Sequence, residues 1–289
     1  MQWSSRICKN RIHDVNNCQS IVIDIAIRQH NTMSRIKKLF EKKNKNILSV
    51  YFTAGFPSLN STLTIMESLQ DAGADMIELG IPYSDPLADG PVIQSSGTMA
   101  LANGMSITLL LKQLKNFRDK IRLPVLFMGY MNPIMQYGFE NFCRDAAEAG
   151  VDGLILPDLP MFEFEKEFGI TVSKFNLDFV FLVTPETKEA RLRKLDQLSS
   201  GFIYAVSSSS TTGKVVTLSD QEKYFERLQR MKLQNPVLIG FGIRDKSSFL
   251  KACTYAAGAI IGTAYIKVLE NATEREIPAR TKEFINSLK

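Results

Sequence analysis

Eight short apolar segments, separated by longer segments with helical periodicity, recur along the chain from residue 47 onward. They read ILSVYF (47–52), DMIELG (75–80), PVLFMGY (124–130), DGLILP (152–157), DFVFLV (178–183), GFIYAV (201–206), PVLIGFG (236–242) and GAIIGT (258–263). They are close to continuous in their apolar character, which is typical of parallel strands buried on both faces. This alternation predicts βα units around a parallel sheet.

The segments between these strands have the spacing of amphipathic helices, for example 61–73, 105–120, 139–150, 188–198 and 219–231. Two of them end at a glycine, Gly73 and Gly150, as is typical of a helix C-cap, where glycine readily adopts the left-handed backbone conformation. Eight strands with their crossovers in about 250 residues predict a single-domain (β/α)8 barrel, the TIM barrel fold. An open, doubly wound sheet is the structural alternative.

Residues 1–32 differ from the rest of the chain, because they hold the only Trp and both His without a clear helical or strand period. We interpret 1–32 as an N-terminal extension, disordered or upstream of the native start, and 33–289 as the barrel. A metal site in the extension is the alternative, formed by Cys8, His13, Cys18 and His30. Their spacing fits no standard zinc pattern, so we predict no metal.

Composition narrows the class of protein. The 35 basic and 30 acidic residues leave a net charge of +5, and the lysines that follow Met33 are typical of a solvated helix, so we expect no nucleic-acid partner. No apolar run approaches the roughly 20 residues of a membrane span, so we expect no membrane partner. The four cysteines form no close pairs, which fits a reducing cytoplasm.

The absence of histidine from Met33 onward excludes histidine-based triads and histidine metal sites from the barrel, which leaves carboxylates for most proton transfer. In a barrel the reacting groups follow the C-terminal ends of the strands. Glu78 lies inside such a strand, between Ile77 and Leu79. Burial there raises the pKa of a carboxyl, which suits a group that both gives and accepts a proton. The alternative is a buried carboxylate in a structural ion pair.

The segment after Glu78 reads GIPYSDPLADGP (80–91) and carries two more carboxylates, Asp85 and Asp89. Pro82, Pro86 and Pro91 restrict its backbone. We take Asp89 as the second catalytic candidate. For Asp85, a role in the turn or in contact with a partner is as plausible as catalysis.

Glycines follow three later strands and indicate an anion site. Gly213 follows the sixth strand, Gly242 ends the seventh, and Gly262 and Thr263 end the eighth just before a short helix. Backbone amides at such loop ends bind phosphate in many barrels. The sequence therefore predicts phosphate binding at Gly213, Gly242, Gly262 and Thr263.

Four motifs in this order, YFTAGFP (51–57), ELGIPYSDPLADGP (78–91), IYAVSSSSTTG (203–213) and IGFGIR (239–244), carry a family resemblance. From about Met33 to its end the chain resembles the alpha subunit of tryptophan synthase, and residues 1–32 have no counterpart. The resemblance implies a lyase that splits indole-3-glycerol phosphate into indole and glyceraldehyde 3-phosphate by a retro-aldol reaction, in the last steps of tryptophan biosynthesis.

The resemblance also implies roles for single residues. Glu78 is then the acid and base at the indole C3 and the glycerol hydroxyl, and Asp89 binds the indole N–H. The residues expected to contact substrate are Tyr204, Tyr130, Thr212 and Phe241. Some members of the family have Ser at the position of Thr263, which keeps the hydroxyl. The serines at 207–210 suggest a loop that closes over substrate.

The same resemblance implies a partner, a pyridoxal-phosphate-dependent beta subunit in an α2β2 complex. We expect no cofactor in this chain, and we expect Pro82, Asp85 and Pro86, with the loops at 132–133 and 158–160, at the interface. Two other functions compete: another phosphate-binding barrel, such as a sugar-phosphate isomerase, and a non-catalytic regulatory subunit. The eight strand runs contain no Lys for the first, and the presence of both Glu78 and Asp89 argues against the second.

Overall fold

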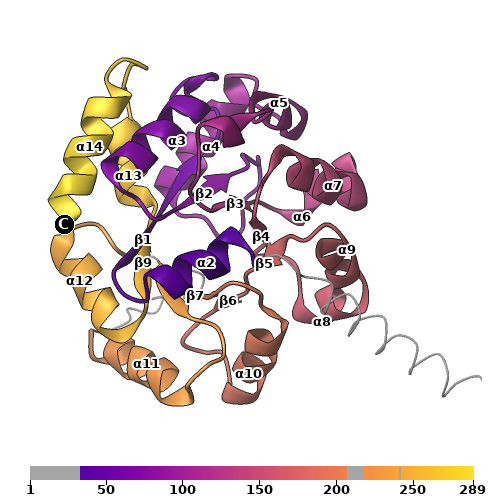
Figure 1. The fold of residues 1–289 in the computed structure, drawn as a ribbon, viewed down its shortest axis with the longest axis vertical. Helices are drawn as coiled ribbons and strands as arrows, with labels where there is room; N and C mark the ends of the chain where they lie inside the picture. The colour runs from indigo at the N-terminus through magenta and orange to yellow at the C-terminus, as the bar shows by residue number, and fades with distance from the viewer. Residues whose placement is uncertain (1–32, 207–217, 241) are drawn as a thin grey trace, which may run out of the picture.

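The computed structural model describes residues 33–206, 218–240 and 242–289 (Figure 1). The predicted extension, residues 1–32, and the alternative metal ligands within it lie outside the described residues. None of the helices in the described ranges is long and apolar enough to cross a membrane.

All eight predicted strand segments form strands of one parallel sheet, ordered β5-β4-β3-β2-β1-β9-β8-β7-β6 in the described chain. Their bounds are β1 Ile47–Thr53, β2 Met76–Gly80, β3 Val125–Met128, β4 Gly153–Ile155, β5 Asp178–Phe179, β6 Leu182–Val183, β7 Ile203–Val206, β8 Val237–Gly240 and β9 Gly258–Ile261. Nearly every residue in them is buried, as their continuous apolar character predicts.

The fifth predicted strand is split, and this split closes the barrel. β5 pairs with β4, whereas β6 pairs with β7 at the other end of the strand order. Only two residues separate them: the Val180 amide donates to the Leu154 carbonyl at 3.0 Å, and the Phe181 carbonyl accepts from the Tyr204 amide at 3.0 Å. The segment 178–183 thus bonds to both edges of the sheet, so the predicted barrel is confirmed and the open sheet is excluded.

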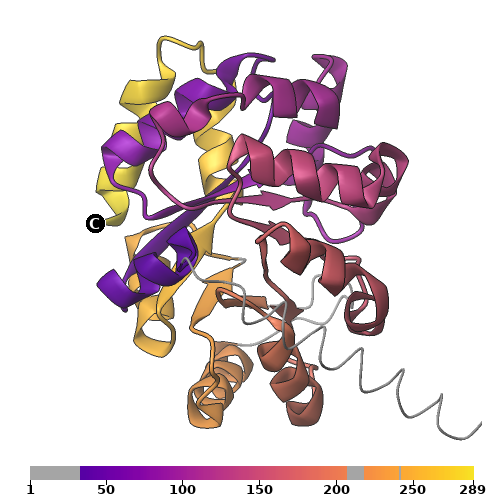
Figure 2. The same cartoon turned by 45° about the vertical axis from the view of Figure 1, so that its right-hand side comes forward.

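Helices surround the strands in a ring (Figures 1 and 2). Their bounds are α2 Arg35–Lys42, α3 Ser61–Ala72, α4 Pro91–Ala102, α5 Ile107–Gln113, α6 Met131–Tyr137, α7 Phe139–Ala149, α8 Met161–Glu163, α9 Gly169–Lys174, α10 Glu189–Leu198, α11 Leu218–Met231, α12 Lys246–Tyr255, α13 Thr263–Leu269 and α14 Ile277–Leu288, with a short 3-10 turn at Phe117–Asp119 and a π turn at Phe164–Phe168. Gly73 and Gly150 end α3 and α7 with φ of 86° and 102°, which confirms both predicted caps. Residues 132–133, expected in a loop, instead lie in the first turn of α6.

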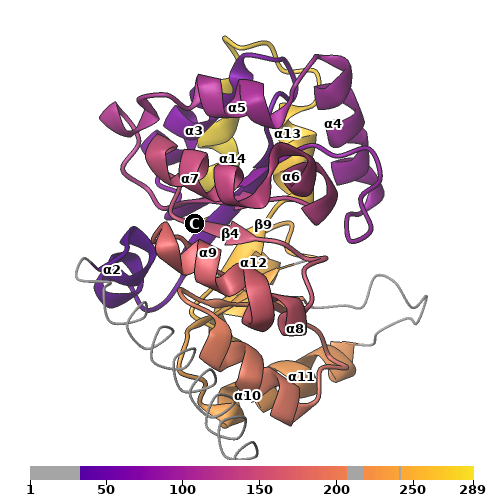
Figure 3. The ribbon, with the colours of Figure 1, turned by 90° about the vertical axis from the view of Figure 1, so that its right-hand side faces the viewer.

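Helix α2 covers the end of the barrel at which the strands begin, and Figure 3 shows it at one side of the molecule. Ile36 is fully buried in this contact, and the Phe40 ring lies 6.1 Å from the Phe202 ring just before β7. The carboxyl ends of the strands lie at the other end of the barrel, where the predicted site residues gather.

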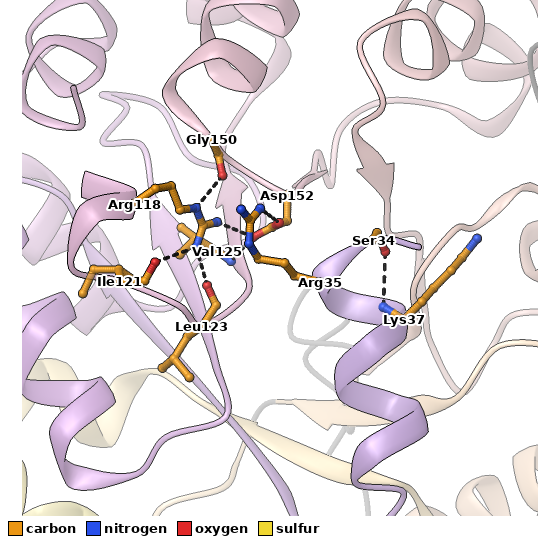
Figure 4. Close-up of polar contacts among 9 residues, drawn as sticks. All are labelled: Ser34, Arg35, Lys37, Arg118, Ile121, Leu123, Val125, Gly150 and Asp152. Carbon is orange, nitrogen blue, oxygen red and sulfur yellow. Dashed lines mark hydrogen bonds and ion pairs between the residues drawn. The ribbon is translucent and has the colours of Figure 1, made fainter. Parts of the chain in front are cut away.

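A buried carboxylate, Asp152, ties α2 to the barrel (Figure 4). Its Oδ1 accepts from Arg35 of α2 at 2.8 Å, and its Oδ2 pairs with Arg118 and accepts from the Val125 amide at 2.8 Å. Arg118 also donates to the carbonyls that end α7 and precede β3. Because this network neutralises the charge of Asp152, the carboxylate can lie directly before β4, at the N-terminal end of the barrel, with almost no exposure.

We expect Asp152→Asn to lower the free energy of unfolding by about 3 kcal/mol, because it leaves Arg118 partly buried without its counter-charge. Urea denaturation measures this loss. Lys174→Gln is the control, since it breaks an exposed ion pair with Glu140 and should cost less than about 1 kcal/mol. Equal losses in the two variants would contradict the role of Asp152.

Candidate active site

Glu78 lies in the middle of β2 with its side chain inside the barrel and no exposed surface. Ser49 of β1 donates a hydrogen bond from Oγ to Glu78 Oε1 at 2.8 Å. Glu78 Oε2 has no hydrogen-bond partner among the described residues. No cationic group of the described chain contacts the carboxyl, so within the described residues the alternative of a buried ion pair finds no support.

Burial raises the pKa of Glu78 to about 8, and the hydrogen bond from Ser49 opposes part of that rise. The cause is desolvation, because the charged carboxylate loses its water while the neutral acid loses little. Glu78 is therefore mostly protonated at neutral pH, and a modest change in its surroundings suffices to ionise it. A carboxyl in this state can serve as acid and then as base.

Asp89 lies at the end of the loop that joins β2 to α4, next to the helix N-cap Gly90. Burial raises the pKa of Asp89, and a hydrogen bond with the Tyr130 hydroxyl lowers it in part. The Tyr130 hydroxyl also accepts a hydrogen bond from the Ala88 amide at 3.1 Å. Tyr130 thus binds the Asp89 carboxyl and also holds the backbone of the loop that carries Asp89.

A cavity of about 340 Å³ opens at the carboxyl ends of the strands. Its lining brings together residues that lie in or follow six different strands, namely Tyr51, Asp89, Ile93, Met128, Tyr204, Gly242, Ile243, Arg244, Ile260, Gly262, Thr263, Ala264 and Lys267. Glu78 does not line the cavity, but it is fully buried beside Tyr51, its neighbour across the β1–β2 pair, which does line it. The cavity wall therefore combines a carboxylate and apolar side chains with glycine backbone and two cations, Arg244 and Lys267.

The two tyrosines occupy space that glycines leave free on neighbouring strands. A Cβ on Gly80 would lie 2.2 Å from the Tyr51 hydroxyl, and a Cβ on Gly240 would lie 2.4 Å from the Tyr204 hydroxyl. Gly262 likewise accommodates the Tyr51 ring. These glycines therefore leave the room that the two aromatic side chains occupy beside the neighbouring strands.

Gly80→Ala should push Tyr51 out of its place, because the added methyl group cannot coexist with the Tyr51 hydroxyl. We expect a loss of about 1 to 3 kcal/mol in the free energy of unfolding, as in other overpacked cores, and an increased KM. Gly97→Ala on α4 is the control, since its Cβ would meet only the Tyr83 carbonyl at 3.8 Å. Thermal unfolding and substrate kinetics of both variants test this; a Gly80→Ala protein as stable as Gly97→Ala would contradict it.

The structure brings most of the predicted site residues together. Asp89, Tyr204, Gly242, Gly262 and Thr263 line the one cavity. Tyr130 contacts Asp89 rather than the cavity. The remaining predicted residues, Thr212, Gly213 and Phe241, lie outside the described residues.

The loop expected at a partner interface is anchored at several points. Pro82 is buried, Pro86 is half-buried and Asp85 is exposed, where it accepts from the Ser84 hydroxyl at 2.5 Å. Asn132 of α6 donates to the Tyr83 hydroxyl at 2.9 Å. Beside these residues, the Leu87 side chain is 78% exposed.

Sequence reasoning missed four residues of the site: Ser49, Tyr51, Arg244 and Lys267. The motif YFTAGFP contains Tyr51, and the alternation of inward-facing positions along β1 could have placed Ser49 and Tyr51 inside the barrel. The motif IGFGIR likewise contains Arg244, whereas Lys267 carried no comparable signal, because exposed cations occur throughout the chain.

Comparison with known proteins gives a consistent result. The family model described as "Tryptophan synthase alpha chain" matches residues 37–289. The proteins of that name from Bacteroides thetaiotaomicron and Flavobacterium psychrophilum are 47% and 49% identical to this chain, over 84% and 86% of it and 96% and 98% of their own lengths.

Solved structures agree in fold. Tryptophan synthase subunit alpha from Legionella pneumophila superposes with a TM-score of 0.81 at 34% identity, covering 89% of this chain and 97% of its own. A chain of the tryptophan synthase complex from Pyrococcus furiosus gives a TM-score of 0.76 at 33% identity, covering 85% and 98%. The chain therefore belongs to the tryptophan synthase alpha chain family, the carbon–carbon lyases that cleave indole-3-glycerol phosphate in tryptophan biosynthesis.

Proposed function

We propose that Glu78 is the proton carrier of the retro-aldol cleavage and that Asp89 binds the indole N–H. The observation that carries this proposal is the desolvated Glu78 carboxyl beside a cavity whose wall includes Asp89. Neutral Glu78 gives its proton to the indole C3, and the resulting carboxylate accepts the proton of the adjacent hydroxyl as the carbon–carbon bond breaks. Asp89, when ionised, stabilises the positive charge that develops on the ring nitrogen.

Glu78 has no exposed surface, so contact with substrate requires neighbouring side chains to move slightly. Tyr51, which lies opposite Glu78 in the β1–β2 pair, and Tyr204 both line the cavity, and in this proposal they are the side chains that move. Tyr204 then contacts the glycerol part of the substrate, and Tyr130 acts through Asp89.

The part of the cavity wall that is lined by glycine backbone suits the phosphate group of the substrate. Gly242, Gly262 and Thr263 offer backbone and hydroxyl donors there, and Arg244 and Lys267 add positive charge. From the sequence, Gly213 joins this set, and Thr212 and Phe241 contact substrate beside it. In this proposal the indole lies beside Glu78 and Asp89, and the phosphate lies beside Gly242, Gly262 and Thr263.

Arg244→Ala and Lys267→Ala are each expected to raise KM for indole-3-glycerol phosphate about two- to fivefold, because exposed cations contribute modestly to anion binding. The kcat should change less than twofold, and the effect on KM should shrink at high salt. Lys45→Ala is the control: it removes the same charge just before β1, at the opposite end of the barrel. A KM that stays unchanged in both variants would show that neither cation meets the phosphate.

A beta subunit that carries pyridoxal phosphate is the partner we propose, in an α2β2 complex, and this chain itself holds no cofactor. The structure from Pyrococcus furiosus is titled a tryptophan synthase complex, which supports a partner of this kind. Pro82, Asp85 and Pro86 belong to the contact surface in this proposal, and a cytoplasmic location stays a prediction from the sequence. Mixing the chain with a beta subunit tests the proposal: an increased rate of the beta reaction supports it, and an unchanged rate argues against it.

Indole formation by the purified chain tests the catalytic proposal against the alternative of a regulatory subunit. A lyase with the proposed site releases indole from indole-3-glycerol phosphate and loses this activity in Glu78→Gln and Asp89→Asn. A regulatory subunit would bind the substrate without turnover and would bind it equally well in both variants.

A further inference from the structure

We infer that Ser49 is a positioning residue: it anchors one oxygen of the Glu78 carboxyl and thereby determines which oxygen carries the proton. The inference rests on the proposed role of Glu78 as acid and base, and it assigns a role to a residue that neither the motifs nor the phosphate site involves.

The strand register places Ser49 beside Glu78. In the parallel pair β1–β2, Tyr51 lies opposite Glu78 and Ser49 lies opposite Met76. Side chains two residues apart on a strand point to the same face, so Ser49 and Tyr51 both face the barrel interior with Glu78. Ser49 and Glu78 are both fully buried, so water does not compete for their contact.

The two carboxyl oxygens of Glu78 have different surroundings. Oε1 accepts the Ser49 hydroxyl at 2.8 Å, whereas Oε2 has no hydrogen-bond partner among the described residues. Because Oε1 already accepts a hydrogen, the neutral acid carries its own proton on Oε2. Ser49 therefore distinguishes an anchored oxygen from a reactive one.

This arrangement fits both proton transfers. The Oε2–H bond breaks as the proton moves to the indole C3, and the negative charge that remains on the carboxylate is stabilised by the Ser49 donor. Oε2 then takes the proton of the hydroxyl on the carbon attached to the ring. The O–H electrons form the aldehyde C=O bond, the carbon–carbon bond electrons return to the indole, and Glu78 is neutral again.

Ser49→Ala tests the inference. We expect kcat for indole formation to fall about ten- to a hundredfold, the effect of losing one hydrogen bond to a charged group, with KM within about twofold of wild type. The alkaline limb of the pH–rate profile should move to higher pH, because the ionised form of Glu78 loses its donor. Ser49→Thr, which keeps the hydroxyl, should recover most of the kcat.

Ser68→Ala is the matched control. Ser68 is also a buried serine, but its hydroxyl donates to the Thr64 carbonyl within α3, away from the cavity. Its kcat and pH profile should equal those of the wild type. If Ser49→Ala does not fold, Ser49→Cys, with similar size and a weak donor, serves in its place and should give an intermediate kcat.

A double variant separates the two claims. If Ser49 acts through Glu78, adding Ser49→Ala to Glu78→Gln should leave the residual rate unchanged. A Ser49→Ala protein with wild-type kcat and an unshifted pH profile would overturn the role of Ser49, even if Glu78→Gln is inactive. An active Glu78→Gln protein would instead overturn the proposed function itself.

Discussion

Glu78→Gln is expected to lower kcat for indole formation by about 10³- to 10⁴-fold, near the upper range for loss of a general acid–base group. The effect is this large because the carboxyl takes part in two proton transfers, and no histidine in the barrel can replace it. Glutamine has the same shape and can still accept from Ser49, so KM should change only a few-fold. Steady-state release of indole from the purified chain measures both parameters.

The matched control for this variant is Glu140→Gln, which changes an exposed glutamate of α7 that pairs with Lys174. Its kcat should equal that of the wild type. A Glu78→Gln protein that retains more than about a tenth of the wild-type kcat would rule out Glu78 as the proton carrier.

Asp89→Asn is expected to lower kcat by about 10²- to 10³-fold, as for removal of one group that stabilises charge in a transition state. Asparagine can still accept a hydrogen bond from Tyr130 and can still accept from the indole N–H. The loss therefore reports the missing negative charge rather than a displaced loop. The expected signature is a reduced kcat with KM within a few-fold of wild type, measured in the same indole assay.

Asp71→Asn, an exposed aspartate of α3, provides the comparison for Asp89→Asn and should keep full activity. If Asp89→Asn raised KM and left kcat unchanged, Asp89 would only bind the substrate. That result would contradict its proposed part in stabilising charge during the reaction.

The strands could be predicted from the sequence because each is buried on both faces, and burial of that kind requires apolar residues at most positions. The split of the segment 178–183 into β5 and β6 was not, because it depends on hydrogen bonds to two strands that lie far apart in the sequence. Helix α6 was missed for a different reason: Pro133 suggested a loop, but it lies in the first turn of the helix, where proline is tolerated.

Glu78 could be predicted because a carboxyl within an apolar strand is costly unless it has a function. For Ser49 and Tyr51 the sequence could indicate a position inside the barrel but not their neighbours, since only the register of β1 with β2 brings them next to Glu78 and Gly80. Arg244 follows β8 and Lys267 lies in α13 after β9, and the pairing of β8 with β9 places both on the same side of the cavity wall, which the residue types alone do not indicate.

The raised pKa of Glu78 also has a consequence for activity. Since the reaction needs neutral Glu78 and ionised Asp89, kcat/KM should fall as pH rises through the pKa of Glu78, and it should also fall at acid pH as Asp89 becomes protonated. At pH 7 most of the enzyme is then in the active form, which a carboxyl with an ordinary pKa would not allow.

The most direct test is a titration of Glu78 itself by NMR, with glutamate labelled with ¹³C at the side-chain carboxyl. The Glu78 resonance is identified as the one that is missing from the spectrum of Glu78→Gln. The account predicts a transition at about pH 8. A transition near the ordinary glutamate value of about 4.3 would mean that Glu78 is ionised at neutral pH and has no proton to give.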